Sequence, residues 1–415
     1  MAKQAVKSKR TVAKSEDPAL AKARRLLKRI PLVDGHNDLP WVIYADADAR
    51  GDVHAYDLNR VHQEGDTDIP HLKQGGLSAQ FWSAFVPTEI VHPGRSVLEV
   101  IDVWRRMNEA HPEIFLQATK SGDILRAKRE GKIASFLTIE GGVGLENSLA
   151  PLRIWHAAGA RLMVLSHNET LDWVDSATDE RRHGGLTEFG REVVRELNRL
   201  GMLIDLAHVT DEVMHQVLDL TRAPIVFSHS NARALCNHPR NVPDDVLKRV
   251  PANGGVVMAT FVPEFINQAA LDWARPLKDE YTKGRKDIDR KAAYAARAKE
   301  LGPPPKATLE QLCDHIEYIA QLIGVKHVGI GSDFFGGDTP DGLEDVSRFP
   351  HLLAELIRRG WSEDAIAALA SGNFLRVFRA VEKVGRQLRQ THAGHLVRHE
   401  DFVAGAPRFE PRWRG

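Results

Sequence analysis

Residues 31–38 read Pro-Leu-Val-Asp-Gly-His-Asn-Asp, a short apolar run followed by polar residues. The run predicts a strand that ends at His36 and Asp38. Residues two apart in an extended chain point to the same face, so these two side chains direct an imidazole and a carboxylate at one point. Such a pair suits a divalent ion such as zinc. A single His-x-Asp is common by chance, so its weight depends on the residues at the ends of the later strands.

Seven more strand-like apolar runs occur along the chain. They occupy residues 77–85, 132–140, 161–166, 201–207, 224–228, 255–261 and 325–331. Helical or long connections separate most of them, and Thr187 and Asp211 are the N-caps that we expect for two of the helices. Eight strands that alternate with helices predict an α/β fold, namely a (β/α)8 TIM barrel with helical insertions.

Composition divides the chain into three parts. Residues 1–17 are basic and polar, and we expect a disordered tail. Residues 18–400 are expected to form a single barrel domain, in which the charged, alanine-rich segment 263–306 makes helical excursions over one end. Residues 401–415 are richer in aromatic side chains than a free tail needs. We expect them to form a C-terminal arm that lies against the barrel or a partner subunit.

The overall charge and cysteine content exclude several classes of protein. Lys plus Arg equals Asp plus Glu, 56 of each, which argues against a general nucleic-acid surface. No apolar run approaches the roughly 20 residues that a membrane span needs, and the N-terminus lacks the apolar stretch of a secretory signal. The two cysteines, Cys236 and Cys313, provide no disulfide framework. We therefore expect a cytoplasmic protein with no membrane or nucleic-acid partner.

Metal-compatible side chains recur where the predicted strands end. They are His36, Asp38, Glu140, His167, His208, His229 and Asp333. In (β/α)8 barrels the active site lies at the carboxyl ends of the strands. Any one of these residues alone is better explained as a cap or a buried core histidine. Together they predict a metal site.

Two metal ions close together need a bridging carboxylate, and Glu140 is the natural candidate. It comes after His36 and Asp38 in the barrel and precedes His208 and His229. Two zinc ions held this way would lower the pKa of a bridging water, polarise a substrate carbonyl and orient both. The sequence thus predicts a binuclear centre.

Asp333 would take a proton from the attacking water and deliver it to a leaving amine. Two further features are open to more than one interpretation. Asp205, three residues before His208, either supports a metal ligand or, at least as readily, bonds backbone as a buried strand residue. A cluster of His392, His395 and His399 has helix-like spacing, and a solvated face is the default interpretation over a surface metal site.

The sequence resembles the renal or membrane dipeptidases, which are binuclear-zinc peptidases on amidohydrolase-type barrels. The similar stretches are residues 34–41, 138–142, 165–168, 203–208, 227–230, 240–245, 329–334, 342–346 and 373–378. The resemblance covers about residues 20–385. It implies a metal-dependent hydrolase of the bacterial type that cleaves dipeptides by a metal-bridging hydroxide, and it allows a D-residue at the second position. It also implies two Zn²⁺ per chain and a homodimer.

The resemblance assigns the metal ligands residue by residue. His36, Asp38 and Glu140 correspond to the ligands of one zinc. Glu140, His208 and His229 correspond to those of the other, so that Glu140 and a water or hydroxide bridge the two ions.

The resemblance also assigns the residues that contact the substrate. His167 corresponds to a histidine that polarises the scissile carbonyl and steadies the oxyanion, and Asp333 to the acid–base carboxylate. Arg240 corresponds to an arginine that grips the free carboxylate of the substrate, for which a bidentate fork is well suited. The family usually has Asp-Phe-Asp-Gly after the last strand, but here Phe335 replaces the second Asp. This change puts in doubt any polar contact from that position and the range of substrates accepted.

Two rival functions fit parts of the pattern. Another amidohydrolase-type metal hydrolase would cut a cyclic amide, a lactone or a phosphoester, but Arg240 suits a peptide carboxylate better. A non-catalytic barrel would have no need to keep Asp333 together with all five ligands.

Overall fold

The computed structural model describes residues 17–63, 65–282 and 290–404. All eight predicted strands are present: β1 (Val33–Asn37), β2 (Ala79–Phe85), β4 (Ile133–Glu140), β5 (Ala160–Val164), β6 (Leu203–Asp205), β7 (Val226–Phe227), β8 (Val256–Ala259) and β9 (Val328–Ile330). They pair in this order, and every pairing is parallel. The predicted (β/α)8 TIM barrel is confirmed.

The barrel closes between its first and last strands, just beyond the end of β9. Asn37 and Phe334 form a parallel bridge there. The Asp38 N–H donates to the Phe334 carbonyl at 3.1 Å, and the Asp333 N–H donates to the His36 carbonyl at 3.2 Å. Closure therefore brings residues of the first strand and residues that follow the last strand to the same point on the rim.

The interior of the barrel is filled by alternate strand residues. Phe136 lies on the same face of β4 as Glu140, because residues separated by an even number along a strand share a face. Its ring stacks on that of Phe81 at 4.6 Å, and Phe374 and Phe378 pack edge-on against this pair. All eight residues of β4 are buried, as expected for a parallel strand covered on both faces.

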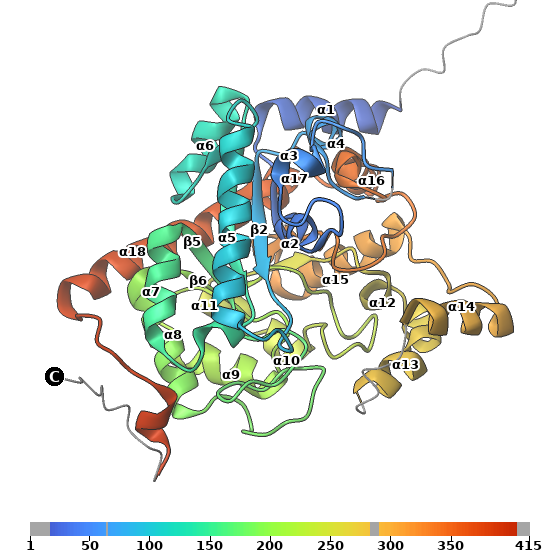
Figure 1. Ribbon diagram of the computed structural model, residues 1–415. Coiled ribbons are helices and arrows are strands. Elements are labelled where there is room, and N and C mark those ends of the chain that lie inside the picture. Colours follow the sequence, from blue (N-terminus) through green and yellow to red (C-terminus); the bar gives the residue numbers. More distant parts are fainter. Residues whose placement is uncertain (1–16, 64, 283–289, 405–415) are drawn as a thin grey trace, which may run out of the picture.

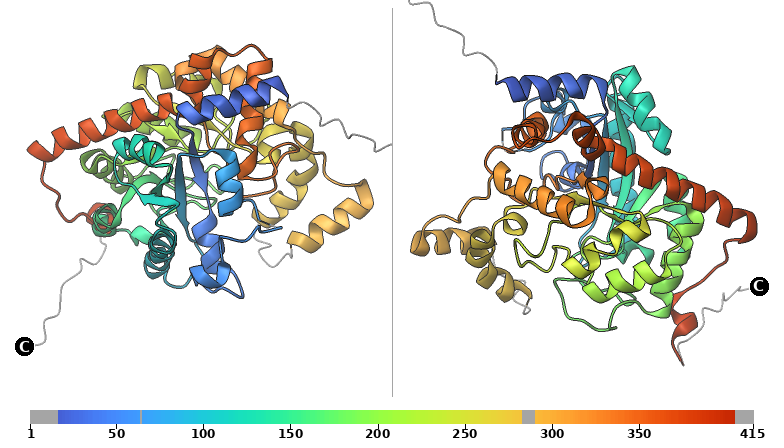
Figure 2. Two further views of the ribbon diagram at one scale, coloured as in Figure 1. Left: turned by 90° about the horizontal axis from the view of Figure 1, so that it is seen from above. Right: turned by 180° about the vertical axis from the view of Figure 1, so that it is seen from behind.

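Helices surround the strands (Figure 2). The longer ones are α1 (Pro18–Arg29), α5 (Pro93–Ala110), α6 (Ser121–Glu130), α7 (Leu149–Ala158), α8 (Glu188–Leu200), α9 (Asp211–Leu220), α13 (Gln268–Thr282), α14 (Arg290–Leu301), α15 (Leu309–Ile323), α16 (Phe349–Arg358) and α18 (Asn373–Thr391). The shorter ones are α2 (Leu39–Ala45), α3 (Val53–Tyr56), α4 (Ile69–Gly75), α10 (Asp244–Leu247), α11 (Val250–Asn253), α12 (Pro263–Ile266) and α17 (Glu363–Ala367). Among the described helices, none combines the length and the apolar character that a membrane crossing requires.

Two local features differ from the sequence-based expectation. A short strand, β3 (Phe115–Gln117), pairs in parallel with the start of β4. The N-cap of α9 is Thr210, whose hydroxyl accepts from the Val213 N–H, and the expected cap Asp211 is the first helical residue. Its carboxylate instead accepts two hydrogen bonds from Arg233, at 2.6 and 2.7 Å. The hydroxyl takes the cap position because it is the side chain that precedes the first turn.

The segment 263–306 contains helices α12, α13 and α14, as expected. Figure 1 shows α13 and α14 at the edge of the molecule, away from the strands. Residues 1–16 of the predicted tail and 405–415 of the predicted arm lie outside the described residues, so the proposed division of the chain stays a prediction.

Candidate metal centre and active site

The predicted ligands and acid–base residues gather at the carboxyl ends of the barrel strands. Three groups of side chains have potential ligand atoms that all lie within 4.8 Å of one another: His36, Glu140 and His229; Glu140, His167 and His208; and His36, Asp38 and Asp333. Glu140 is the last residue of β4, and the others lie in their strand or within three residues after it. Asp38 occupies the N-cap position of α2, but its side chain makes no capping bond and its carboxylate faces the site.

Glu140 divides its two carboxylate oxygens between different histidines. Its Oε2 lies 3.1 Å from His36 Nε2. Its Oε1 lies 3.2 Å from His208 Nε2 and 3.7 Å from His229 Nε2. The Ser83 hydroxyl donates to Oε2 at 2.8 Å and orients the carboxylate. This is the arrangement that a carboxylate bridging two cations requires.

The nitrogen and oxygen atoms of this cluster lack ordinary partners. His36 Nε2 and Asp38 Oδ1 are buried and 3.5 Å apart, yet neither makes a hydrogen bond of good geometry with any described residue. His208 Nε2 and His229 Nε2 lie only 3.0 Å apart. Two imidazole nitrogens approach this closely when one proton lies between them or when both lone pairs bind a cation. The donor set of imidazoles and carboxylates therefore fits divalent metal ions.

The charges of the cluster are set by burial and by the neighbouring carboxylates. Burial, reinforced by Arg240, holds the pKa values of His208 and His229 well below the usual range, so both rings are neutral. Burial also lowers the pKa of His36, but the carboxylates of Glu140 and Asp38 outweigh it and hold that pKa well above its usual value. Metal ligation needs neutral imidazoles, the state in which His208 and His229 are already held, whereas a cation bound at His36 would replace the ring proton that the two carboxylates favour.

Asp333 is in a different electrostatic position from Glu140. Burial raises the pKa of Asp333 to about 8, opposed by His36 and reinforced by Asp38 and Glu140. A divalent cation bound beside this carboxyl would lower its pKa again. Asp333 has φ 66° and His208 has φ 72°, the left-handed region that residues other than glycine seldom adopt. Such strain is typical of functional sites, and here it lies where the chain leaves a strand at the rim.

His167 and Arg240 lie beside the cluster and supply hydrogen-bond donors. The ring of His167 lies 4.4 Å from that of His208, and burial lowers the pKa of His167 to about 4. Arg240 is 2% exposed, and burial lowers its pKa to about 10, so it stays charged at neutral pH. Its Nη2 donates to the His229 carbonyl at 3.4 Å. Its Nε and Nη1 have no hydrogen-bond partner among the described residues.

Comparisons with known proteins show the family to which the chain belongs. A model of the family described as membrane dipeptidase (peptidase family M19) matches residues 20–392. The chain belongs to this family. It is 38% identical over 378 residues to dipeptidase 3 of Rattus norvegicus, a match that covers 89% of this chain and 69% of that protein.

Two solved structures extend the comparison to the fold. The probable dipeptidase PvdM from Pseudomonas aeruginosa is 28% identical, with a TM-score of 0.77 over 88% of this chain and 99% of that one. A metallo peptidase from Rhodobacter sphaeroides, liganded with a phosphinate mimic of the dipeptide L-Ala-D-Ala, shares the fold. It has a TM-score of 0.69 and 22% identity over 85% of this chain and 99% of that one. The predicted family and the predicted enzyme class, a metallo-dipeptidase and therefore a hydrolase, are confirmed.

The structure explains two features that the sequence left open. Asp205 Oδ1 accepts from the Ala207 N–H at 2.9 Å and from the Ser228 N–H at 3.0 Å, so this carboxylate ties β6 to the end of β7. Asp205 therefore has a structural role, in which its carboxylate accepts hydrogen bonds from the backbone. His392 and His395 are exposed. Neither is part of a metal-compatible group within the described ranges.

Phe335, the residue that departs from the family pattern, contacts the loop before α4. The Phe335 N–H donates to Asp66 Oδ2 at 2.8 Å, and the backbone has φ 71°. The Phe335 ring lies against Gly65, where an added Cβ would meet its Cε1 at 3.5 Å. The ring therefore packs on the loop before α4.

Two residues that sequence reasoning missed support the ligands. The Ser83 hydroxyl donates a hydrogen bond to Glu140. The Ser228 hydroxyl lies 2.7 Å from His229 Nδ1, and this contact orients the imidazole so that Nε2 points into the site. Both serines lie in or next to buried strands, where a polar residue without a partner would be costly. That burial is the signal by which they could have been found.

Proposed function

We propose that this member of the membrane dipeptidase family hydrolyses the peptide bond of dipeptides at a centre of two zinc ions. The observation that carries the proposal is the division of the Glu140 carboxylate, with one oxygen facing His36 and the other facing His208 and His229. A carboxylate with separate sets of ligands on its two oxygens is suited to hold two cations close together.

The ligands proposed for one ion are His36, Asp38 and Glu140, and those for the other are Glu140, His208 and His229. Imidazole and carboxylate ligands at tetrahedral or near-tetrahedral sites are typical of zinc. When bound, the ions would supply Lewis acidity and a water of lowered pKa.

Three side chains of the chain would act on the substrate directly. Arg240 would bind the free carboxylate of the dipeptide through the edge of its guanidinium, which carries donors without other partners among the described residues. His167, neutral at physiological pH, would donate a ring N–H to the carbonyl oxygen as negative charge develops on it. Asp333 would accept a proton at its carboxylate and transfer it to the amine that leaves.

The length of the substrate is limited by the fixed position of Arg240. A free carboxylate one residue past the cut lies within reach of the guanidinium, whereas a longer peptide would carry this charge elsewhere. We extend the proposal to dipeptides with a D-residue at the second position, because the family resemblance allows them. We also propose that the protein is a homodimer and is located in the cytoplasm.

The Arg240→Ala variant tests the proposal with two substrates. A charge-assisted bidentate pair contributes a few kcal/mol, and each ~1.4 kcal/mol is tenfold, so kcat/KM for a dipeptide should fall by roughly two orders of magnitude. It should fall far less for the matching dipeptide amide, which offers Arg240 no carboxylate. Arg240→Lys should rescue poorly, because a point ammonium does not reproduce the fork.

Arg233→Ala is the matched control for the loss of an arginine. Arg233 lies on the same connection but pairs with Asp211, at 2.6 and 2.7 Å. Arg233→Ala should change kcat/KM for the acid and for the amide substrate by the same factor. If Arg240→Ala also affected both substrates equally, Arg240 would have a structural role and the carboxylate clamp would be wrong.

A further inference from the structure

An aromatic ring that belongs to none of the family motifs faces the proposed carboxylate clamp. Phe265, in the short helix α12, lies with its ring under Arg240, whose Cζ is 5.3 Å from the ring centroid. Phe265 is 8% exposed and Arg240 is 2% exposed, so little water separates them. A guanidinium over an aromatic face is attracted by the negative face of the ring, and more strongly when both groups are desolvated.

The ring of Phe265 is held in place from two sides. The ring of His238 lies 4.3 Å from it, and His238 Nδ1 in turn accepts from the Arg240 N–H at 3.1 Å. The Asn241 side-chain amide donates to the Phe265 carbonyl at 2.8 Å. The loop that carries Arg240 and the helix that carries Phe265 are therefore joined on both the backbone and the side-chain level.

The guanidinium has few other restraints. Its one hydrogen bond within the described part of the chain is the 3.4 Å contact to the His229 carbonyl, and no carboxylate pairs with it there. A carboxylate partner would fix the guanidinium but would also occupy the N–H edge that the substrate needs. An aromatic face stabilises the cation from its flat side and leaves that edge free.

We propose that Phe265 is a positioning residue, which holds the Arg240 guanidinium by a cation–π contact so that its N–H edge is ready for the substrate carboxylate. This inference rests on the proposed function of Arg240. It assigns a role to α12 in binding the dipeptide carboxylate.

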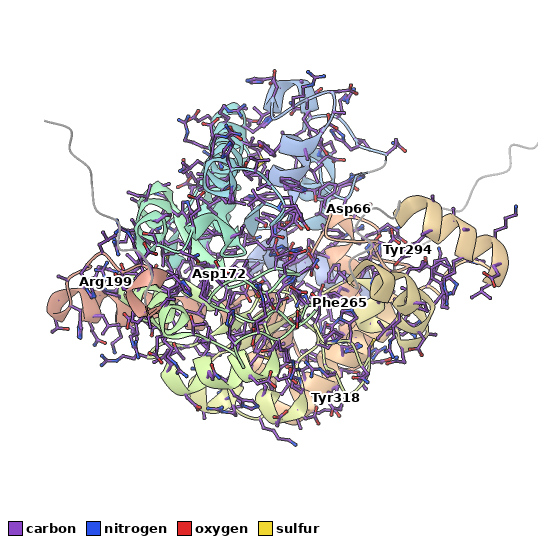
Figure 3. The ribbon with its side chains drawn as sticks, turned by 60° about the horizontal axis from the view of Figure 1, so that its bottom comes forward. Asp66, Asp172, Arg199, Phe265, Tyr294 and Tyr318 are labelled. Atoms are coloured by element: carbon purple, nitrogen blue, oxygen red, sulfur yellow. The ribbon has the colours of Figure 1, made fainter. Side chains whose placement is uncertain are left out.

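The helical excursion after α12 supports this arrangement. Glu264, next to Phe265, accepts a hydrogen bond from the Tyr294 hydroxyl at 3.3 Å. Tyr294 packs on Trp273 at 5.4 Å, and Arg297 lies over the Trp273 ring at 5.4 Å. Figure 3 shows Phe265 toward the centre of the molecule and Tyr294 farther out, among the α13–α14 helices. The excursion thus braces α12 from outside the barrel.

The test compares Phe265→Leu with Phe265→Tyr, using a dipeptide and its amide. Leu keeps the site apolar but removes the ring face, so KM for the dipeptide should rise roughly tenfold while kcat stays nearly constant. KM for the amide should hardly change, and Tyr should restore the wild-type values because it keeps the ring. Phe189→Leu is the matched control: Phe189 is fully buried and packs on Trp173 and His399. It should leave the acid-to-amide ratio unchanged.

Fluorinated phenylalanines at position 265 provide a measurement that does not depend on folding of the Leu variant. Added fluorines weaken the negative face of the ring and change its shape little. KM for the dipeptide should therefore rise stepwise with the number of fluorines, and KM for the amide should not.

The outcomes separate this inference from the proposed function. Suppose that Arg240→Ala lowers kcat/KM for the dipeptide far more than for its amide. If the Phe265 variants then change KM for both substrates equally, or fluorination leaves KM unchanged, Phe265 is not a positioning residue and the proposed role of Arg240 stands. If Arg240→Ala fails to discriminate, the clamp itself is wrong, whatever Phe265 does.

Discussion

Asp34 and Ser332 join the first and last strands of the barrel. The Asp34 carboxylate accepts the Ser332 N–H at 2.7 Å and the Ser332 hydroxyl at 2.6 Å, although the two residues are 298 positions apart in the chain. Both are buried. Because Asp34 precedes His36 and Ser332 precedes Asp333, these bonds hold two sides of the metal site together.

Ser332→Ala should destabilise the barrel. Burial raises the pKa of Asp34 to about 6, so at pH 7 the carboxylate is ionised and its hydrogen bonds are charge-assisted. Loss of one such bond costs ~1.5–3 kcal/mol, which should appear as a lower free energy of unfolding in urea. Ser230→Ala is the control, because that buried hydroxyl has no partner among the described residues. Equal effects of the two changes would show that the Asp34–Ser332 bond adds nothing to stability.

The metal content should reflect the division of the Glu140 oxygens. Protein produced with ample zinc should hold about two ions per chain. His36→Ala should lose the ion on one side and His208→Ala the ion on the other, so each should retain about one, whereas Glu140→Ala should impair both sites. Elemental analysis measures this directly. A wild-type content of one ion or none would contradict the binuclear centre.

Asp333→Asn should separate proton transfer from metal binding. The amide keeps the size of the side chain but is a far weaker base, and general acid–base catalysis contributes about 10²–10⁴-fold in rate. We expect kcat to fall by that factor while the zinc content stays near the wild-type value. A variant that kept most of its kcat would show that another group moves the proton.

Asp66 should make the stability of the protein fall as the pH rises. Burial raises the pKa of Asp66 to about 6, opposed by the Phe335 N–H and reinforced by Asp345 and Asp338. Because the value in the unfolded chain is near 3.8, the folded state binds more protons between these values. The stabilisation is therefore complete below about pH 4 and lost above about pH 6, and it amounts to at most ~3 kcal/mol.

Asp66→Asn tests this dependence. The free energy of unfolding of the variant minus that of the wild type should increase from pH 4 to pH 7, as measured by urea unfolding at several pH values. Asp48→Asn, at an exposed site, measures the background. A difference that stays constant with pH would mean that Asp66 titrates normally in the folded protein.

The strands and the chemistry of their ends could be predicted from the sequence. Apolar runs with a polar residue after them are local patterns, and the carboxyl ends of parallel strands necessarily meet at one rim. His36, Glu140 and His208 therefore lie at the same rim because the strands that carry them are parallel. β3 was missed because a three-residue strand has too little periodicity to recognise.

The contacts between these side chains depend on non-local geometry. Which oxygen of Glu140 faces His36, how Asp34 meets Ser332, and that Phe265 lies under Arg240 are all set by strand register, barrel closure and the path of the loops. None of these has a periodic signal, because each contact joins residues whose distance in sequence is unrelated to their distance in space. The local sequence pattern determines which segments form strands and helices, and the closure of the barrel determines which of their side chains are in contact.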